Sequence, residues 1–554
     1  MKGKIAACLI LSLGIMILAC GGEGVELTAS LEHIQNQEDK LAPVILTDDL
    51  GELPDQEVEV LKLIVKAARY MDDAFLVQVN GDNPDLLRSL EAANDDHIRP
   101  YLEYFKIMFG PWDRLDDDRP FIGTKIKPAG ANYYPPDLTR EDFRSWIQNH
   151  PDDRETFESE FTMIRRRMNN LVAIPYSDYF KAQLKPAAAL LKEAAALTSD
   201  RSLATFLNSR ADAFLSDDYF QSDMDWMDLA GDIEVVIGPY EVYEDGLMGY
   251  KAAFESFVCV VDHEASRQQA DITGMQKELE NQLPVPDHYK NYDRGTDSPI
   301  KVVNLVFSAG DTKAGIQTTA FNLPNDERVR EAKGSKKVML KNVMRAKFDQ
   351  CWIPIVNTVL APATLKRVSF DGYFYHVLLH EVSHGLGPGT ITLNGEKTTV
   401  GKALKELYSI IEEAKADVVG MYMTQYLIDR GTLPRSLENE LYASNLGGMF
   451  RSIRFGIDEA HGAGVAIQLN YYMDQGACHV TPDGKFEVND RKYRKAVKSL
   501  AEKLLLIEAH GDYEAAADLI AEYREIRPEV RAALDRLSHV PIDIRPVYPV
   551  EDEI

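Results

Sequence analysis

The chain of 554 residues is poor in cysteine, and its basic residues are outnumbered by acidic ones. Its five cysteines include no Cys-x-x-Cys pair, which argues against a cysteine-based zinc site. Lysine and arginine number 61 against 88 aspartates and glutamates, so the formal net charge is -27 and binding to nucleic acid is disfavoured. Hydrophobic residues make up 45% and charged residues 27%, as in soluble globular proteins. At about 100–200 residues per domain, this length predicts two or more packed units.

The N-terminus resembles a bacterial lipoprotein signal. Lys2 and Lys4 precede an apolar run at 5–19, which ends at Cys20 and two glycines. The run is too short to span a membrane comfortably. We expect residues 1–19 to be removed and Cys20 to be lipidated, which would anchor the chain in the bacterial cell envelope, outside the cytoplasm, in the periplasm or at the cell surface. The alternative is an uncleaved N-terminal anchor helix.

Sequence patterns divide the rest of the chain into helical and sheet-forming stretches. From about residue 25 to 230, and again from residue 372, apolar residues recur every three or four positions, which is typical of helices. Stretches rich in β-branched and aromatic residues, where we expect a small sheet, are 233–243, 254–261 and 302–307. Residues 284–299 are expected to connect two units, because they are rich in Pro, Asp, Gly and Asn. The three prolines within 541–554 predict an extended strap over the surface.

The sharpest chemical signal is an HExxH sequence, His380-Glu381-Val382-Ser383-His384. Histidines four apart on a helix lie on one face, where both can bind a single Zn²⁺, while Glu381 projects beside the metal to accept a proton from water. The stretch 263–267 begins in the same way but lacks the second histidine. His376, one turn earlier, is a rival ligand. We interpret it as a packing or supporting residue, because three adjacent side chains on one straight helix cannot easily enclose a tetrahedral ion.

A third ligand is expected nearby, because catalytic zinc commonly takes three protein ligands and leaves one position open. A helix predicted over about 402–429 carries the sequence Glu412-Glu413-Ala-Lys-Ala-Asp417. Glu413 and Asp417 are four apart and share a helix face, so one can bind the metal while the other orients a ligand histidine through its second ring nitrogen. The alternative is that these acids form a solvated charged face.

Together these residues resemble the dipeptidyl peptidase III family of zinc peptidases. The segments that carry the resemblance are HEVSHGLGPG from His380, EEAKAD from Glu412, GPYEVYED from Gly238, FNLPND from Phe321, and DEAHGAG around His461. The family's usual motif is HExxGH, with six residues. The five-residue motif of this chain resembles that of a minority of bacterial members. The similarity before residue 230 is too weak to align.

The resemblance implies a role for each motif residue. The side chains implied to bind one zinc ion per chain are His380, His384 and Glu413. Glu381 is implied to be the general base. The carboxylates implied to orient the ligands are Asp417 and Glu412.

The same resemblance assigns residues that act on the substrate. Tyr243 and His461 resemble the groups that stabilise the oxyanion of the tetrahedral intermediate, and both can donate hydrogen bonds to developing charge. Residues similar to those that hold the substrate's N-terminal ammonium and first peptide units are Glu241, Asn322 and Asn325, and a carboxylate with two amides suits that task. Glu244 and Val465 stand where arginine is common in the family, so subsite preferences are expected to differ.

The fold implied is α+β and mostly helical, with two lobes around a wide cleft: a helical zinc-binding lobe, and a mixed lobe with a small β-barrel. We expect 20–262 and 305–350 to form the mixed lobe. The helical lobe is expected to comprise 263–304 and 351–554, including the zinc site and the C-terminal strap. Lobe closure would exclude water and long folded substrates.

The function implied is a zinc-dependent exopeptidase that acts on short peptides and releases N-terminal dipeptides. One alternative is another zinc peptidase, which cuts inside oligopeptides or releases single residues. A second alternative is a non-catalytic surface lipoprotein that captures peptides. The intact Glu381 argues against the second, because an inactive site has no need of a base.

Overall fold

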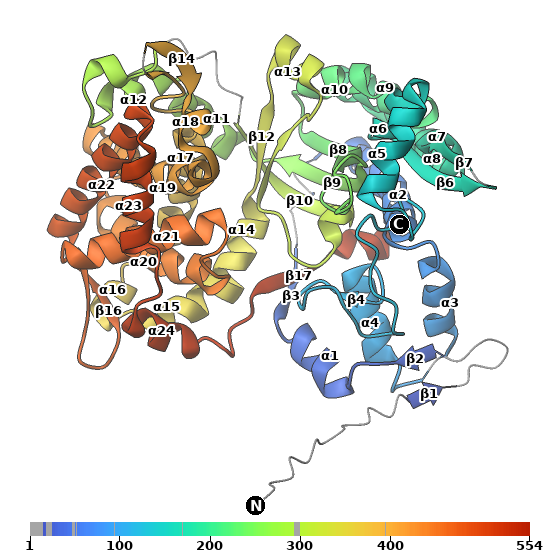
Figure 1. Ribbon diagram of the computed structural model, residues 1–554, viewed down its shortest axis with the longest axis horizontal. Coiled ribbons are helices and arrows are strands. Elements are labelled where there is room, and N and C mark those ends of the chain that lie inside the picture. Colours follow the sequence, from blue (N-terminus) through green and yellow to red (C-terminus); the bar gives the residue numbers. More distant parts are fainter. Residues whose placement is uncertain are drawn as a thin grey trace, which may run out of the picture. The chain divides into compact units, whose positions relative to one another are not determined.

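The computed structural model describes residues 15–17, 25–46, 50, 53–93, 95–168, 170–292, 300–393 and 395–554. The chain divides into two compact units. Unit 1 comprises Met1–His263, Lys301–Val343 and Asp543–Ile554, and unit 2 comprises Glu264–Ile300 and Met344–Ile542. Figure 1 shows that helices predominate in unit 2 and that unit 1 combines helices with a sheet. The predicted α+β, mostly helical class is therefore confirmed.

Unit 1 is built on a five-stranded sheet with the order β11-β12-β10-β9-β8. The strands anticipated by the sequence are β8 (Ile233–Glu241), β9 (Ala253–Val261) and β10 (Ile300–Gly310). The sheet is completed by β11 (Ala320–Leu323) and β12 (Lys336–Leu340). Strand β9 lies antiparallel to both β8 and β10, and β11 lies antiparallel to β12. The implied small barrel takes the form of an open sheet with β8 and β11 at its edges.

Helices and short hairpins surround this sheet in unit 1. Helix α2 (Asp55–Val79) packs against β9 and against α8 (Lys181–Leu197), through apolar residues that recur at helical spacing. The other helices are α1 (Leu31–Glu38), α3 (Asn83–Ala93), α4 (Arg99–Met108), α5 (Arg140–Asn149), α6 (Arg154–Glu158), α7 (Tyr176–Tyr179), α9 (Arg201–Ser216), α10 (Phe220–Met227) and α13 (Glu327–Lys333). The short antiparallel pairs are β4 (Trp112–Asp113) with β5 (Arg119–Pro120) and β6 (Thr162–Arg167) with β7 (Asn170–Pro175).

The C-terminal segment differs from the expected surface strap. Strand β17 (Asp543–Val547) pairs in parallel with β3 (Leu41–Ile45), and a short helix follows at Pro549–Glu553. Ile544 and Tyr548 are buried, and the Tyr548 hydroxyl lies 2.6 Å from Ser308 Oγ of the sheet. The expectation that this segment belongs to the helical lobe is therefore wrong, because its apolar side chains pack into unit 1.

Unit 2 is a helical bundle. At its centre α19 (Tyr408–Arg430) packs against α17 (Phe370–Ser383), α21 (Ala460–Asp474) and α22 (Asp490–His510). Its other helices are α11 (His263–Thr273), α12 (Gln276–Gln282), α14 (Lys341–Lys347), α15 (Ile353–Val359), α16 (Pro362–Leu365), α18 (Val400–Leu404), α20 (Leu437–Arg454), α23 (Tyr513–Tyr523) and α24 (Pro528–Asp535), of which α11 and α14 begin in unit 1. Two hairpins join β13 (Thr390–Leu393) to β14 (Glu396–Thr399) and β15 (Cys478–Val480) to β16 (Phe486–Val488).

The helix predicted over 402–429 is interrupted. Helix α18 ends at Leu404, and Lys405 adopts a left-handed backbone conformation with φ of 53°. A regular α-helix cannot continue through that conformation, so α19 begins only at Tyr408. The acidic motif lies within α19, in its first turns.

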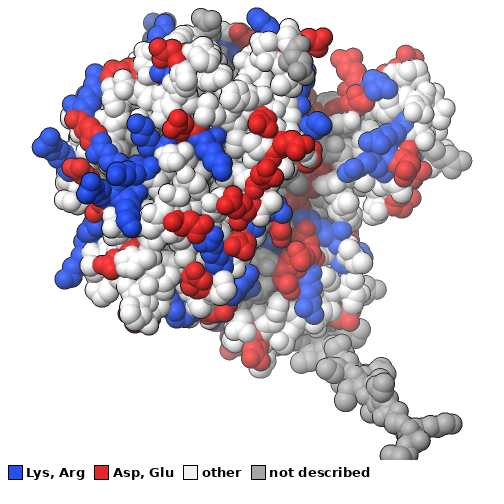
Figure 2. All heavy atoms as spheres, turned by 60° about the vertical axis from the view of Figure 1, so that its left-hand side comes forward, with Lys and Arg blue, Asp and Glu red and all other residues white. Residues whose placement is uncertain are grey.

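The N-terminal signal falls largely outside the described residues. Cys20 is not among them, and Ile15–Ile17 forms β1, antiparallel to β2 (Val25–Leu27). Among the described residues, none of the helices combines the length and the apolar content needed to cross a bilayer. Figure 2 shows acidic and basic side chains together on one face of the molecule, although acids outnumber bases in the chain as a whole.

Candidate active site

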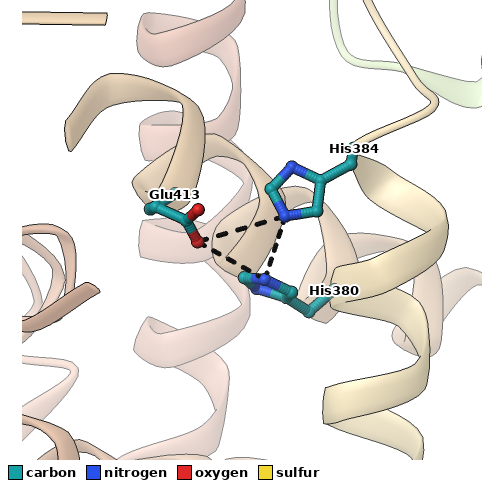
Figure 3. A group of neighbouring side chains, drawn as sticks. All are labelled: His380, His384 and Glu413. Atoms are coloured by element: carbon teal, nitrogen blue, oxygen red, sulfur yellow. Dashed lines mark hydrogen bonds and ion pairs between the residues drawn. The ribbon is translucent and has the colours of Figure 1, made fainter. Parts of the chain in front are cut away.

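The HExxH sequence lies at the C-terminal end of α17. The helix begins after Ser369, whose hydroxyl accepts a hydrogen bond from Gly372 N, and it ends at Ser383, with His384 as the capping residue. His380 and His384 are thus one helical turn apart and on one face, as the spacing predicted. Both imidazoles point toward Glu413 of α19 (Figure 3).

Three ligand atoms converge at this point. The two imidazole Nε2 atoms of His380 and His384 are 3.1 Å apart. Glu413 Oε2 lies 3.5 Å from the first and 4.0 Å from the second. Within the described residues, this group is one of the few in which histidine and carboxylate ligand atoms lie close enough together to share a metal ion.

Each histidine is held by its own carboxylate through the other ring nitrogen. His380 Nδ1 lies 2.7 Å from Asp417 Oδ1, and His384 Nδ1 lies 2.8 Å from Glu412 Oε1. A carboxylate accepts hydrogen bonds, so these contacts place the proton on Nδ1 and leave both Nε2 lone pairs directed at each other and at Glu413. Three electron-pair donors that face one another repel unless a cation lies between them. The site therefore fits Zn²⁺, for which two imidazoles and a carboxylate are a common ligand set.

Electrostatics keep the two orienting carboxylates ionised. Burial works to raise the pKa of Asp417, but its electrostatic interaction with His380, which includes the hydrogen bond from Nδ1, holds that pKa well below its usual range. Burial likewise works to raise the pKa of Glu412, but Lys415 and the hydrogen bond with His384 lower it below its usual range. Both carboxylates therefore remain hydrogen-bond acceptors throughout the physiological pH range, which fixes the tautomers of the two histidines.

Two further histidines lie near the three ligand atoms. His376 Nε2 is 3.5 Å from Asp417 Oδ1 and contacts Asn445, so it lies beside an orienting carboxylate and not in the ligand group. His461, at the start of α21, places Nε2 at 2.9 Å from Glu413 Oε2. The hydrogen bond to Glu413 raises the pKa of His461 to about 9. The site thus offers a hydrogen-bond donor on a partly exposed imidazole.

Two glycines allow the three helices to approach closely. A Cβ atom at Gly420 of α19 would lie 2.8 Å from His380 N, and one at Gly464 of α21 would lie 3.0 Å from Ala414 N. The neighbouring atoms are backbone in both cases, so a side chain there would push the helices apart. Gly420 lies outside the sequence motifs, whereas Gly464 is the last residue of the DEAHGAG segment. Both are glycines in otherwise continuous helical patterns.

The residues implied to hold the substrate lie in unit 1. Glu241 ends β8, Asn322 lies in β11, and Asn325 follows β11 and donates a hydrogen bond to Tyr240 O over 3.0 Å. Burial raises the pKa of Glu241, although a hydrogen bond from Asn325 acts in the opposite direction. Tyr243 is 83% exposed, and the charge of Glu241 raises the pKa of its phenol. Tyr243 is therefore a protonated donor at neutral pH.

The loop that carries Tyr243 is fixed by the two acids that follow it. Glu244 is buried and forms ion pairs with Arg114 at 2.9 Å and Lys127 at 3.0 Å. Asp245 accepts hydrogen bonds from the Tyr134 hydroxyl and from backbone amides of the same loop. The sequence marked Glu244 as a departure from the family pattern. Its contacts show that this carboxylate forms ion pairs with two basic side chains of unit 1.

The chain is similar to proteins of known class. A family model described as "Peptidase family M49" matches residues 139–393. Solved structures of dipeptidyl-peptidase III include one from Caldithrix abyssi, with a TM-score of 0.91 and 50% identity over 94% of this chain and 99% of that one. Another, from Corallococcus sp. strain EGB, has a TM-score of 0.77 and 43% identity over 94% of this chain and 97% of that one.

Two curated relatives extend the comparison. A protein of Arabidopsis thaliana named Nudix hydrolase 3 is 38% identical over 94% of this chain and 74% of its own length. Dipeptidyl peptidase 3 of Nematostella vectensis is 30% identical over 34% of this chain and 29% of its own length. The likeness to the solved structures includes the part before residue 230, which the sequence motifs could not align. The chain therefore belongs to the dipeptidyl peptidase III family, peptidase family M49, and is a metallopeptidase that acts on peptides.

Proposed function

We propose that the protein is a zinc-dependent exopeptidase that removes dipeptides from the N-terminus of short peptides. The convergence of three ligand atoms, with each histidine held by its own carboxylate, is the observation that carries the proposal. Zn²⁺ held by His380, His384 and Glu413 would supply Lewis-acid chemistry, which would lower the pKa of a water molecule to near neutrality. The similarity to dipeptidyl peptidase III structures supports the same reaction class.

The chain's own residues supply the proton transfers and the hydrogen bonds. Glu381 lies between the two histidines on α17, where its carboxylate accepts a proton from the attacking water and passes it to the leaving amine. Tyr243 and His461 are assigned by resemblance to donate hydrogen bonds to the developing oxyanion. The phenol of Tyr243, with its raised pKa, carries the proton that this role requires.

Product length depends on how the substrate's N-terminus is held. We assign the ammonium to Glu241, whose carboxylate can form a charge-assisted hydrogen bond, and the first peptide units to Asn322 and Asn325. A peptide anchored two residues from the scissile bond yields a dipeptide. Release of single amino acids, or cuts within the chain, would instead indicate another type of zinc peptidase, and bound zinc without turnover would indicate peptide capture.

A pentapeptide with a free N-terminus should be cleaved to a dipeptide and a tripeptide, whereas its N-acetylated form should resist cleavage. Glu241→Gln should lower kcat/KM on the free peptide by about 10–100-fold, because a charge-assisted hydrogen bond contributes about 1.5–3 kcal/mol. Product masses and initial rates measure both effects. Glu327→Gln, at an exposed glutamate of the same unit, serves as the matched control. Equal cleavage of the free and acetylated peptides would contradict N-terminal anchoring.

We also propose that Cys20 is lipidated and holds the enzyme on the membrane in the cell envelope. Expressed in a bacterial host, the full chain should fractionate with membranes and require detergent for release, and Cys20→Ala should fractionate as soluble protein or as an unprocessed precursor. Cys259→Ala is the matched control, because Cys259 is a buried cysteine of unit 1. Membrane attachment of mature Cys20→Ala protein would show that another segment anchors the chain.

A further inference from the structure

Lys415 is a buried cation one turn along α19 from Glu412. Its side chain is only 1% exposed. The Nζ atom donates three hydrogen bonds, to Glu412 Oε1 at 2.9 Å, Ser383 O at 3.0 Å and Leu386 O at 3.2 Å. An ammonium group has three N–H donors, so all of its donors are used.

The two carbonyl acceptors lie on either side of His384. Ser383 is the last residue of α17, and Leu386 lies in the turn that follows. Ser383 O lies at the end of α17, where helix carbonyls carry the negative end of the helix dipole, so a cation stabilises it. Lys415 therefore fixes the backbone on both sides of His384 to α19, the helix that also carries Glu413.

The third acceptor connects Lys415 to the imidazole itself. Glu412 Oε1 accepts hydrogen bonds from both Lys415 Nζ and His384 Nδ1. One lysine thus restrains the position of His384 in two ways, through the backbone and through the carboxylate that orients its ring. Neither sequence spacing nor the ligand motif indicates this link, because it depends on the packing of α17 against α19.

We propose that Lys415 is a positioning residue of the metal centre, which sets the orientation of His384 by holding Glu412 and the end of α17. The inference rests on the zinc site of the proposed function. The hydrogen-bond partners of Lys415 Nζ are Glu412 Oε1 and two backbone carbonyls, none of them one of the three ligand atoms, so its effect passes through His384. Loss of partners that orient a metal ligand typically lowers metal affinity about 10–100-fold.

The test measures zinc affinity by chelator competition on the purified full-length variants, together with the melting temperature of each metal-free protein. Lys415→Met should weaken zinc binding about 10–100-fold, because it removes the hydrogen bonds that Lys415 donates to Glu412 and to the two carbonyls. Lys415→Arg should retain affinity within about threefold of the wild type, since a guanidinium also supplies several donors. The absorption spectrum of the Co²⁺ form should change in Lys415→Met and not in Lys415→Arg.

Lys336→Met is the matched structural control. Lys336 is another buried lysine, and its Nζ bonds to Trp226 O and to Glu234 in unit 1. This variant should lower the melting temperature of the metal-free protein without changing zinc affinity. A merely structural Lys415 would behave in the same way, so equal zinc affinity of Lys415→Met and the wild type would overturn the inference.

A double-mutant cycle tests the route through Glu412. Lys415→Met and Glu412→Gln should have non-additive effects on zinc affinity, because both act on the same hydrogen bond to His384. Additive effects would overturn that route. If Lys415→Met fails to fold, Lys415→Gln takes its place in the cycle. Failure of the wild type to bind zinc would overturn the proposed function itself, whereas tight binding by the wild type and all Lys415 variants would overturn only the role of Lys415.

Discussion

Replacement of Glu381 by glutamine should lower kcat by about 10²–10⁴-fold while leaving zinc bound. The amide has nearly the same shape as the carboxylate but cannot accept the proton of the attacking water. Zinc should remain, because the group of ligand atoms comprises His380, His384 and Glu413 and does not include Glu381. The measurements are kcat on a cleavable peptide and the zinc content of the purified variant.

The chain provides its own control for this substitution. Glu264 follows His263 in a segment that begins like the HExxH motif but lacks the second histidine, and it lies on the exposed surface of α11. Glu264→Gln makes the same chemical change and should leave kcat unchanged. More than about a tenth of wild-type kcat in Glu381→Gln would show that another group accepts the proton, since general-base catalysis typically contributes at least about 10²-fold.

The candidate metal site could be predicted largely from local spacing. Residues four apart on one helix share a face whatever the rest of the fold does, so the pairs His380 with His384 and Glu413 with Asp417 followed from the sequence. The pairing between the two helices did not follow from the residues alone. Asp417 meets His380, and Glu412 meets His384, only because α17 and α19 pack face to face, with Gly420 allowing the close approach.

Strand pairing between segments far apart in the sequence could not be predicted from local sequence patterns. Strand β17 pairs with β3, which lies almost at the other end of the chain, and the prolines at 541–554 gave no sign of that register. Strands β11 and β12 were not predicted, because they are short and carry polar residues such as Asn322 and Lys337. The three strands with long apolar, β-branched runs were found near their observed positions.

The adjacent acids Glu412 and Glu413 give the sharpest test of the metal geometry, because they have the same chemistry and different positions. Glu413 Oε2 faces both imidazole Nε2 atoms, whereas Glu412 Oε1 bonds to the Nδ1 atom of His384. Glu413→Gln should therefore weaken zinc binding by more than about 100-fold. Glu412→Gln should weaken it by about 10–100-fold, the usual cost of losing a group that orients a ligand.

Comparison of these two variants removes the common effects of the substitution. Each loses one negative charge at neighbouring positions of α19, so a general change in the electrostatic potential would affect zinc affinity in both to a similar extent. Zinc dissociation constants are measured for both variants by chelator competition at one pH. Their ratio then compares the loss of a metal ligand, Glu413, with the loss of the residue that orients a ligand, Glu412. A larger loss in Glu412→Gln than in Glu413→Gln would reverse the two roles, and it would require His384 to bind the metal through Nδ1. The observed 2.8 Å contact between that atom and Glu412 argues against such a reversal.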